Sequence, residues 1–149
     1  MERVYLASGW FNDTQRKLMN EIYEVLSEFY KESKLIFFAP YYNGTVLKPD
    51  DPRSKWEKTF KLDVEMVKNS TLMVANIEGF EPGTIFEVGL AYAWKVPIIA
   101  YSSVPGRGLN LMLAMSCIGF ANSQQELKTL LTRFLKGERN LNKWEGEPI

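Results

Sequence analysis

Apolar residues along the chain form five short continuous runs, separated by longer segments in which they recur every three or four positions. Continuous apolar runs are typical of strands covered on both faces, and the longer period is typical of amphipathic helices. The predicted strands are residues 3–7, 34–39, 71–77, 96–101 and 117–121. The alternation of the two patterns predicts one α/β domain over residues 1–149, built on a mostly parallel five-stranded sheet.

Four helices are predicted around these strands, each with a recognisable start. Three have capping-box spacing, in which a small polar residue is followed three positions later by Glu or Gln. These pairs are Asn12 with Gln15, Ser54 with Glu57, and Ser123 with Glu126. In helix 82–95, Pro82 suits the first turn and Glu81 is placed to cap it. Helix 54–69 carries an apolar stripe that we expect to face the core: Trp56, Phe60, Val64 and Val67.

Ligands of parallel α/β folds bind at the carboxyl ends of the strands. The segments that follow the first four predicted strands are 8–13, 40–44, 78–83 and 102–110. They are rich in Gly, Asn and aromatic residues, which suits a small flat ligand.

Composition excludes several classes of function. Eighteen basic residues balance eighteen acidic ones without a basic block, which argues against binding to nucleic acid or a membrane surface. The lack of histidine excludes Ser-His-Asp triads, Cys-His dyads and histidine metal sites. No P-loop or GxGxxG motif is present, and we expect no cofactor and no metal. With Cys117 as the single cysteine, and neither a signal peptide nor a membrane-length apolar run, we expect a cytoplasmic protein.

Two carboxylates lie where a charge is costly. Glu87 belongs to an otherwise apolar helix and has no basic residue one turn away, and Asp63 points toward the apolar stripe of helix 54–69. Structural hydrogen bonds would explain either acid alone, but two acids just beyond ligand-lining loops favour a function. Glu81 has a sufficient role as a helix cap, and the same position aims it into the crevice. Such acids favour chemistry at an acetal-like carbon, where one carboxylate attacks and a protonated acid assists the leaving group.

Five parts of the sequence carry a family resemblance. They are "VYLASGWFNDTQ" (4–15), Asp63, "EPGTIFEVGLAYA" (81–93), "LNLM" (109–112) and "KWEGEPI" (143–149). In order and spacing they resemble the nucleoside 2-deoxyribosyltransferases, in particular the type II branch that exchanges purines and pyrimidines. The resemblance implies a flavodoxin-like three-layer sandwich that transfers 2-deoxyribose between nucleobases, with deoxynucleosides and free bases as its ligands.

The resemblance also implies roles for single residues. Glu87 would be the nucleophile that forms a covalent deoxyribosyl-enzyme, Asp63 would hold or protonate the base beside Glu81, and Tyr5 would orient the nucleophile. The residues implied in substrate binding are Gly9, Trp10 and Phe11 in the first loop, together with Asn43, Asn110, Met112 and Ile149. Two positions depart from the family pattern: Glu81 stands where Asp is usual, and Asn43 stands where Gln is expected.

Family members are homo-oligomers, so the resemblance implies a hexamer built from dimers, in which the α-carboxylate of Ile149 reaches the ligand or Tyr5 of a neighbouring subunit. From its residues alone, the tail 140–149 would be a frayed end. Two other functions stay open. A nucleoside 5′-monophosphate N-glycosidase requires donors for a phosphate dianion, and residues 7–13 contain no Arg or Lys. A non-catalytic nucleotide-sensing module would bind its ligand without turnover.

Overall fold

The computed structural model describes residues 1–103 and 108–149, and its centre is a five-stranded sheet in which every pairing is parallel. In spatial order the strands are β2 (Leu35–Phe38), β1 (Glu2–Ala7), β3 (Leu72–Asn76), β4 (Ile98–Tyr101) and β5 (Gly119–Ala121). The predicted single-domain α/β fold is confirmed, and the sheet is parallel throughout. Because the chain passes from β1 to β2 on one side and then to β3 on the other, the carboxyl ends of β1 and β3 mark a topological switch point.

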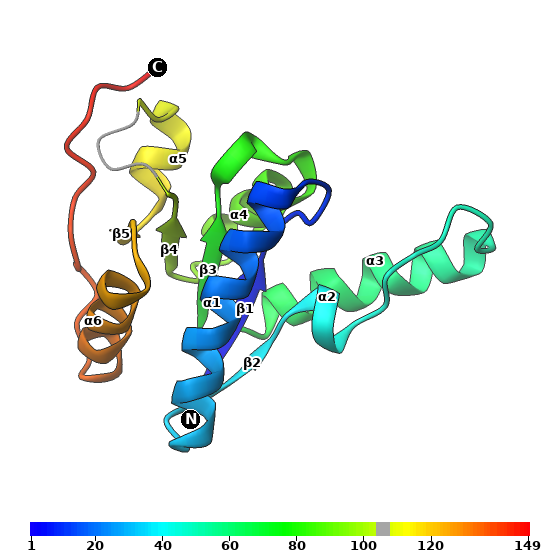
Figure 1. Ribbon diagram of the computed structural model, residues 1–149, viewed down its shortest axis with the longest axis horizontal. Coiled ribbons are helices and arrows are strands. Elements are labelled where there is room, and N and C mark those ends of the chain that lie inside the picture. Colours follow the sequence, from blue (N-terminus) through cyan, green and yellow to red (C-terminus); the bar gives the residue numbers. More distant parts are fainter. Residues whose placement is uncertain (104–107) are drawn as a thin grey trace.

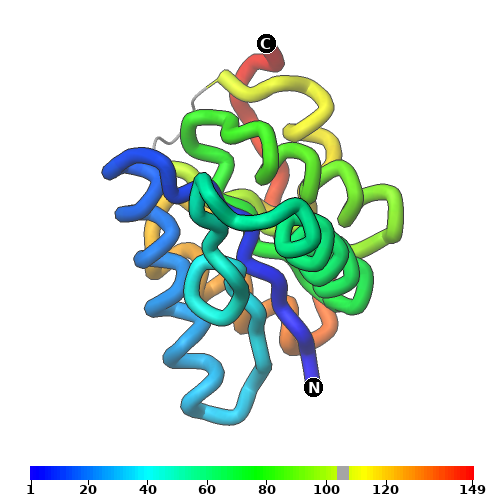
Figure 2. Tube along the Cα trace, turned by 90° about the vertical axis from the view of Figure 1, so that its right-hand side faces the viewer, coloured from blue at the N-terminus to red at the C-terminus, as the bar shows by residue number. Residues whose placement is uncertain are grey.

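Helices cover both faces of the sheet and give three layers (Figures 1 and 2). One face packs against α1 (Asp13–Lys31) and α6 (Gln124–Leu135), and the other against α4 (Pro82–Ala93), α5 (Leu111–Ser116) and the end of α3 (Arg53–Lys68). Successive residues of a strand point to opposite faces. Leu6 of β1 therefore belongs to the core under α1, whereas its neighbour Tyr5 belongs to the core under α4. This alternation sends the Tyr5 hydroxyl to the face that carries Glu87.

Helix α3 differs from the prediction in its exposure. Only Val67, near its carboxyl end, is buried, whereas Trp56 and Phe60 are exposed. The first half of α3 and the segment before it project from the body of the molecule (Figure 1), so the sheet does not lie beneath this part of the stripe. The predicted cap at Ser54 is also wrong, because α3 begins at Arg53 after Pro52 and has no side-chain cap.

The other predicted helix starts are observed. Asn12 Oδ1 accepts a hydrogen bond from the Gln15 amide at 2.8 Å, and Ser123 Oγ accepts one from the Glu126 amide at 3.1 Å. Three short elements were not predicted: α2 (Pro40–Asn43), the 3-10 turn η1 (Glu78–Phe80) and α5. All three lie in segments that follow strands, where the sequence signal is one of turns rather than of periodicity.

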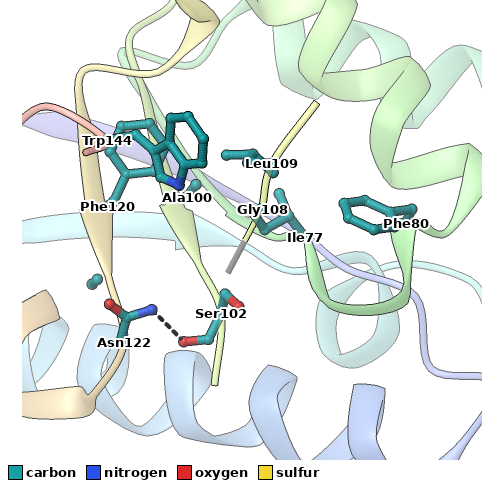
Figure 3. A pocket seen from close by; sticks show the side chains of 10 residues that line it. Ile77, Phe80, Ala100, Ser102, Gly108, Leu109, Phe120, Asn122 and Trp144 are labelled. Atoms are coloured by element: carbon teal, nitrogen blue, oxygen red, sulfur yellow. Dashed lines mark hydrogen bonds between the residues drawn. The ribbon is translucent and has the colours of Figure 1, made fainter. Parts of the chain in front are cut away.

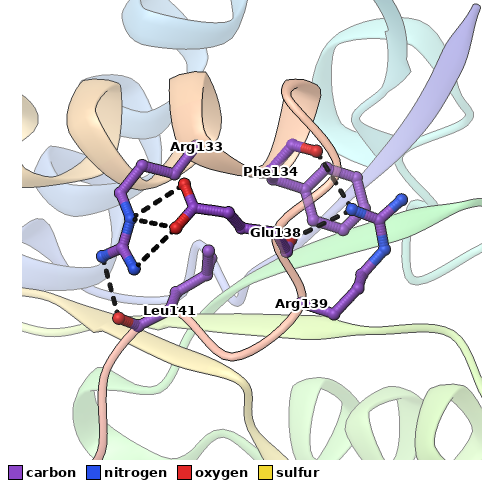
Figure 4. A network of polar contacts seen from close by, with 5 residues as sticks. All are labelled: Arg133, Phe134, Glu138, Arg139 and Leu141. Atoms are coloured by element: carbon purple, nitrogen blue, oxygen red, sulfur yellow. Dashed lines mark hydrogen bonds and ion pairs between the residues drawn. The ribbon is translucent and has the colours of Figure 1, made fainter.

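The tail after α6 is docked on the body instead of frayed. Arg133 forms an ion pair with Glu138 and donates to the Leu141 carbonyl at 2.8 Å (Figure 4). Leu141 is buried, and the Asn142 side chain bonds both the amide and the carbonyl of Phe120 at the edge of the sheet. Within residues 1–103 and 108–149, no helix combines the length and hydrophobicity needed to cross a membrane.

Candidate active site

A void of about 210 Å³ lies between the first loop, α2, α3 and α4. It is lined by Ser8, Trp10, Phe11, Pro40, Phe60, Asp63, Val64, Glu81, Gly83, Phe86 and Glu87. The two helices contribute in the same way, because residues 60, 63 and 64 of α3 and residues 83, 86 and 87 of α4 have the spacing of one helix face. Each of these faces presents one aromatic ring and one carboxylate to the void.

Glu87 is held by Tyr5. The Tyr5 hydroxyl, at the end of a fully buried side chain on β1, donates a short hydrogen bond to Glu87 Oε2. Burial raises the pKa of Glu87 to about 8, and the charges of Asp63 and Glu81 act in the same direction, whereas the bond from Tyr5 lowers the pKa. Burial and the charge of Glu87 together raise the pKa of Tyr5 far above its usual value, so the hydroxyl stays a donor. The geometry thus fixes one carboxylate oxygen and leaves Oε1 for other contacts.

Asp63 faces the same void from α3. Its Oδ1 is buried and has no hydrogen-bond partner among residues 1–103 and 108–149. Burial raises the pKa of Asp63 to about 6. A buried carboxylate oxygen without a hydrogen-bond donor costs free energy. A ligand that brings a donor group to Asp63 would relieve that cost.

Glu81 is engaged by the amino end of α4. Its two carboxylate oxygens accept from the amides of Gly83 at 3.0 Å and Thr84 at 2.7 Å, and from the Thr84 hydroxyl at 2.9 Å. Its aliphatic part packs on Gly9, where an added Cβ would lie 2.6 Å from Glu81 Cγ. Glu81 therefore caps α4 and closes the first loop against it, with its carboxylate at the wall of the void.

The first loop is fixed by buried amides. Gln15 Oε1 accepts from the Phe11 amide at 3.0 Å, and the Asn76 side chain donates to Ser8 Oγ at 3.0 Å and to the Gln15 carbonyl at 3.2 Å. Trp10 lies 5.5 Å from Phe11 between ring centroids. The loop therefore presents aromatic rings to the void from a backbone that is held in place on the side of α1.

Four residues implied in substrate binding lie elsewhere. Asn43 Oδ1 accepts a hydrogen bond from the Ala39 amide at 2.9 Å, and Asn43 does not line the void. Asn110 caps α5 by accepting from the Met112 amide at 2.9 Å, and Ile149 N donates to the Leu109 carbonyl at 3.0 Å. Met112 and Ile149 are 75% and 74% exposed. The α5 and tail residues lie beyond α4 from α3 (Figure 1), so one copy of the chain does not bring them to the void.

Two aromatic residues of the void, Phe60 and Phe86, were missed by sequence reasoning. The sequence pattern places Phe60 in a core-facing stripe and gives no reason to select Phe86. The available signal was the helix spacing, since a face that presents Asp63 also presents the residue three positions earlier. A second cavity, of about 50 Å³, lies near the ends of β4 and β5 between Trp144, Leu109 and Phe120 (Figure 3). None of the three carboxylates lines it.

The void beside Glu87 combines two acids with raised pKa values and apolar aromatic side chains. Between about pH 6 and pH 8, Asp63 and Glu87 hold one proton between them, mostly on Glu87, because its pKa is the higher of the two. Attack by Glu87 therefore uses the less populated form of the pair, in which the proton lies on Asp63. One ionised and one protonated carboxyl group is the arrangement needed for nucleophilic attack at an acetal-type carbon with assistance to the leaving group.

Comparisons with solved structures agree with the fold. The fold matches a 2-deoxyribosyltransferase from Bacillus psychrosaccharolyticus with a TM-score of 0.77 at 24% identity, covering 89% of this chain and 95% of that one. A conserved protein from Enterococcus faecalis gives 0.72 at 19% identity, covering 90% and 99%. The CMP N-glycosidase of Clostridium botulinum gives 0.56 at 19% identity, covering 88% and 99%.

Comparison with curated protein sequences finds no match. The model of the nucleoside 2-deoxyribosyltransferase family matches residues 4–131, which include Tyr5, Asp63, Glu81 and Glu87. The chain therefore belongs to the nucleoside 2-deoxyribosyltransferase family.

Proposed function

We propose that this protein transfers 2-deoxyribose from one nucleobase to another by double displacement on Glu87. The observation that carries the proposal is the placement of Glu87 and Asp63 on one void, with a Tyr5 hydroxyl bound to one oxygen of Glu87. Membership of the family and the likeness to a deoxyribosyltransferase fold support the same reaction.

In the first half-reaction, Glu87 Oε1 attacks the anomeric carbon of a deoxynucleoside and forms an ester to the sugar. The bond between that carbon and the base nitrogen breaks, its electron pair goes to the base, and Asp63 supplies the proton that the departing base requires. In the second half, a nitrogen of a new base attacks the same carbon, its proton returns to Asp63, and Glu87 leaves as a carboxylate. The positive charge that develops on the sugar lies next to Glu87, so its attraction is greatest in the transition state.

We further propose that a neighbouring copy of the chain completes the site. Asn110, Met112 and Ile149 lie together on an exposed edge of the molecule, away from the void of their own chain. In an oligomer these residues would face the sugar bound by another subunit, with the α-carboxylate of Ile149 near the ligand or Tyr5.

The test of the reaction is base exchange. Incubation with a deoxynucleoside and a different free base should yield the new deoxynucleoside, and Glu87→Gln should abolish this product because an amide does not attack the sugar carbon. Mass spectrometry of the quenched wild-type protein should find a deoxyribosyl adduct on Glu87. Release of free deoxyribose without an exchange product, or exchange by the Gln variant, would contradict the proposal.

The second candidate is hydrolysis of nucleoside 5′-monophosphates, favoured by the fold match to a CMP N-glycosidase. A phosphate dianion requires strong donors, and the cation beside the first loop is already engaged. Arg16 donates to the Trp10 carbonyl at 2.9 Å and forms an ion pair with Asp13. We therefore expect nucleosides to be better substrates than their 5′-monophosphates, and the opposite preference would select the hydrolase.

A further inference from the structure

We propose that Phe60 and Phe86 form a stacking wall for the nucleobase and help to determine which bases bind. The inference rests on the proposed function and adds to it a second aromatic face of the same void, contributed by α3 and α4. We call Phe60 and Phe86 the stacking wall.

The two rings make one continuous surface. Their centroids are 6.3 Å apart and their planes are tilted by 40°, within the range of interacting aromatic pairs. Phe60 comes from α3 and Phe86 from α4, so the surface crosses the junction between the helices. Both line the void, and yet they are 58% and 51% exposed. Because covering exposed apolar surface is favourable, a ligand that packs on either ring would gain affinity from it.

The position of the wall relative to the acids favours a base over a sugar as its ligand. Phe60 lies one turn before Asp63 on the same helix face, and Phe86 directly precedes Glu87. Asp63 protonates the base in the proposed reaction, so the flat part of the ligand must lie within reach of α3. The rings of Trp10 and Phe11 enter the same void from the first loop. A planar base between these two sets of rings would be in contact with aromatic carbon on both of its faces.

The chain offers matched controls. Trp56 is on α3 one turn before Phe60, and Tyr92 is on α4 after Phe86; both are exposed aromatic residues that do not line the void. If the exposed rings on these helices only hold copies of the chain together, replacing a ring of the stacking wall and replacing a control ring should change base affinity to the same extent. If the wall binds the base, only Phe60 and Phe86 should matter to base affinity.

The experiment measures binding of adenine and of cytosine by isothermal titration calorimetry, without turnover. Phe60→Ala and Phe86→Ala should each weaken binding about tenfold, given the usual size of stacking on one aromatic residue. Phe60→Leu, which keeps apolar bulk without a ring, should weaken it nearly as much, whereas Phe60→Tyr should retain affinity. Trp56→Ala and Tyr92→Ala should bind both bases as the wild type does.

Light scattering and thermal unfolding of every variant separate the remaining explanations. Unchanged base affinity in both Phe→Ala variants would overturn the proposal, as would an equal loss in the two controls. A change in oligomeric mass with no change in base affinity would show that the wall is an interface, and this also overturns it. Because binding is read without chemistry, the wall can be demonstrated even if base exchange is never observed, which would remove the transferase proposal alone.

Discussion

The three carboxylates that line the void differ in the hydrogen-bond donors around them, and the charges of Asp63 and Glu81 raise the pKa of Glu87. Glu81 has three donors from the start of α4, Glu87 has one donor from Tyr5, and the buried oxygen of Asp63 has none among the described residues. The pKa values of Asp63 and Glu87 are raised to about 6 and about 8. Glu81 therefore serves as a helix cap, whereas Asp63 and Glu87 form the proposed pair of acid and nucleophile. All three line the same void.

The pair of acids predicts a specific pH dependence. In the wild type, kcat/KM for a deoxynucleoside should be highest between about pH 6 and pH 8, because below this range both acids are protonated and above it both are ionised. Asp63→Asn should lower the rate by roughly 10²–10⁴-fold. The substitution should also remove the fall in rate at alkaline pH, since residue 63 no longer carries a proton that the reaction uses and that can be lost. The remaining rise should occur below pH 8, because the charge of Asp63 no longer raises the pKa of Glu87. A bell-shaped profile that persists in the Asn variant would show that Asp63 is not the acid.

The ionised form of Glu87 should lower the free energy of unfolding. Its folded pKa of about 8 lies above the unfolded value of 4.5, so the folded state is fully favoured below the unfolded pKa and loses stability as pH rises through the folded pKa. Glu87→Gln removes this loss. We expect the variant to gain stability relative to the wild type as the pH rises, by on the order of 4 kcal/mol between pH 5 and pH 9. Urea unfolding at several pH values measures the difference, and a difference that does not change with pH would refute the raised pKa of Glu87.

At the scale of elements, the strands and the long helices were predictable because their patterns are long and are enforced by the core. The starts at Asn12, Glu81 and Ser123 followed from local side-chain geometry. The stripe on α3 was not interpretable in the same way, since an apolar helix face has the same spacing whether it covers a sheet or lines a void. Asp63 and Glu87 could be selected from sequence because a charge at an apolar position is costly, whereas Phe60 at such a position raises no contradiction.

The closure of the first loop against α4 can be tested at one glycine. A Cβ on Gly9 would lie 2.6 Å from Glu81 Cγ and 2.7 Å from Gln15 Oε1, and both of these side chains are held by hydrogen bonds. Gly9→Ala should therefore displace the loop or the α4 cap, lowering stability by about 1–3 kcal/mol and reducing exchange activity more than tenfold. Thermal unfolding and steady-state kinetics provide the measurements.

Gly89→Ala is the matched control. Gly89 lies within α4, and a Cβ there meets nothing within 4 Å. We expect this change to raise stability by roughly 0.5–1 kcal/mol through helix propensity and to leave the void unchanged. Normal activity in Gly9→Ala would mean that the loop adapts and that its tight contact with Glu81 is dispensable.

At the scale of the whole molecule, two of the regions that expose large apolar side chains bear on the site. One surrounds the void and includes Phe11, Phe60 and Phe86, and the other contains α5 residues and the end of the tail. The tail end is ordered by contacts within its own chain, notably the Leu109–Pro148 bridge and the bond from the Ile149 amide to Leu109. The proposed oligomer would bring this apolar edge of one copy to the apolar rim of the void in another.

This arrangement predicts complementation between two inactive variants. A chain with Glu87→Gln lacks the nucleophile but can supply its tail, and a chain with Ile149 deleted keeps the nucleophile but cannot supply the α-carboxylate at its normal position. Each variant alone should show little exchange. Co-expressed, they should recover roughly a quarter of wild-type activity, since random pairing across a two-fold interface completes that share of the sites. The same recovery should follow when the second chain instead carries residues added after Ile149, whereas residues added before the exposed Met1 should be harmless. A fully active monomer in light scattering, or deletion of Ile149 without loss of rate, would show that each chain forms its site alone.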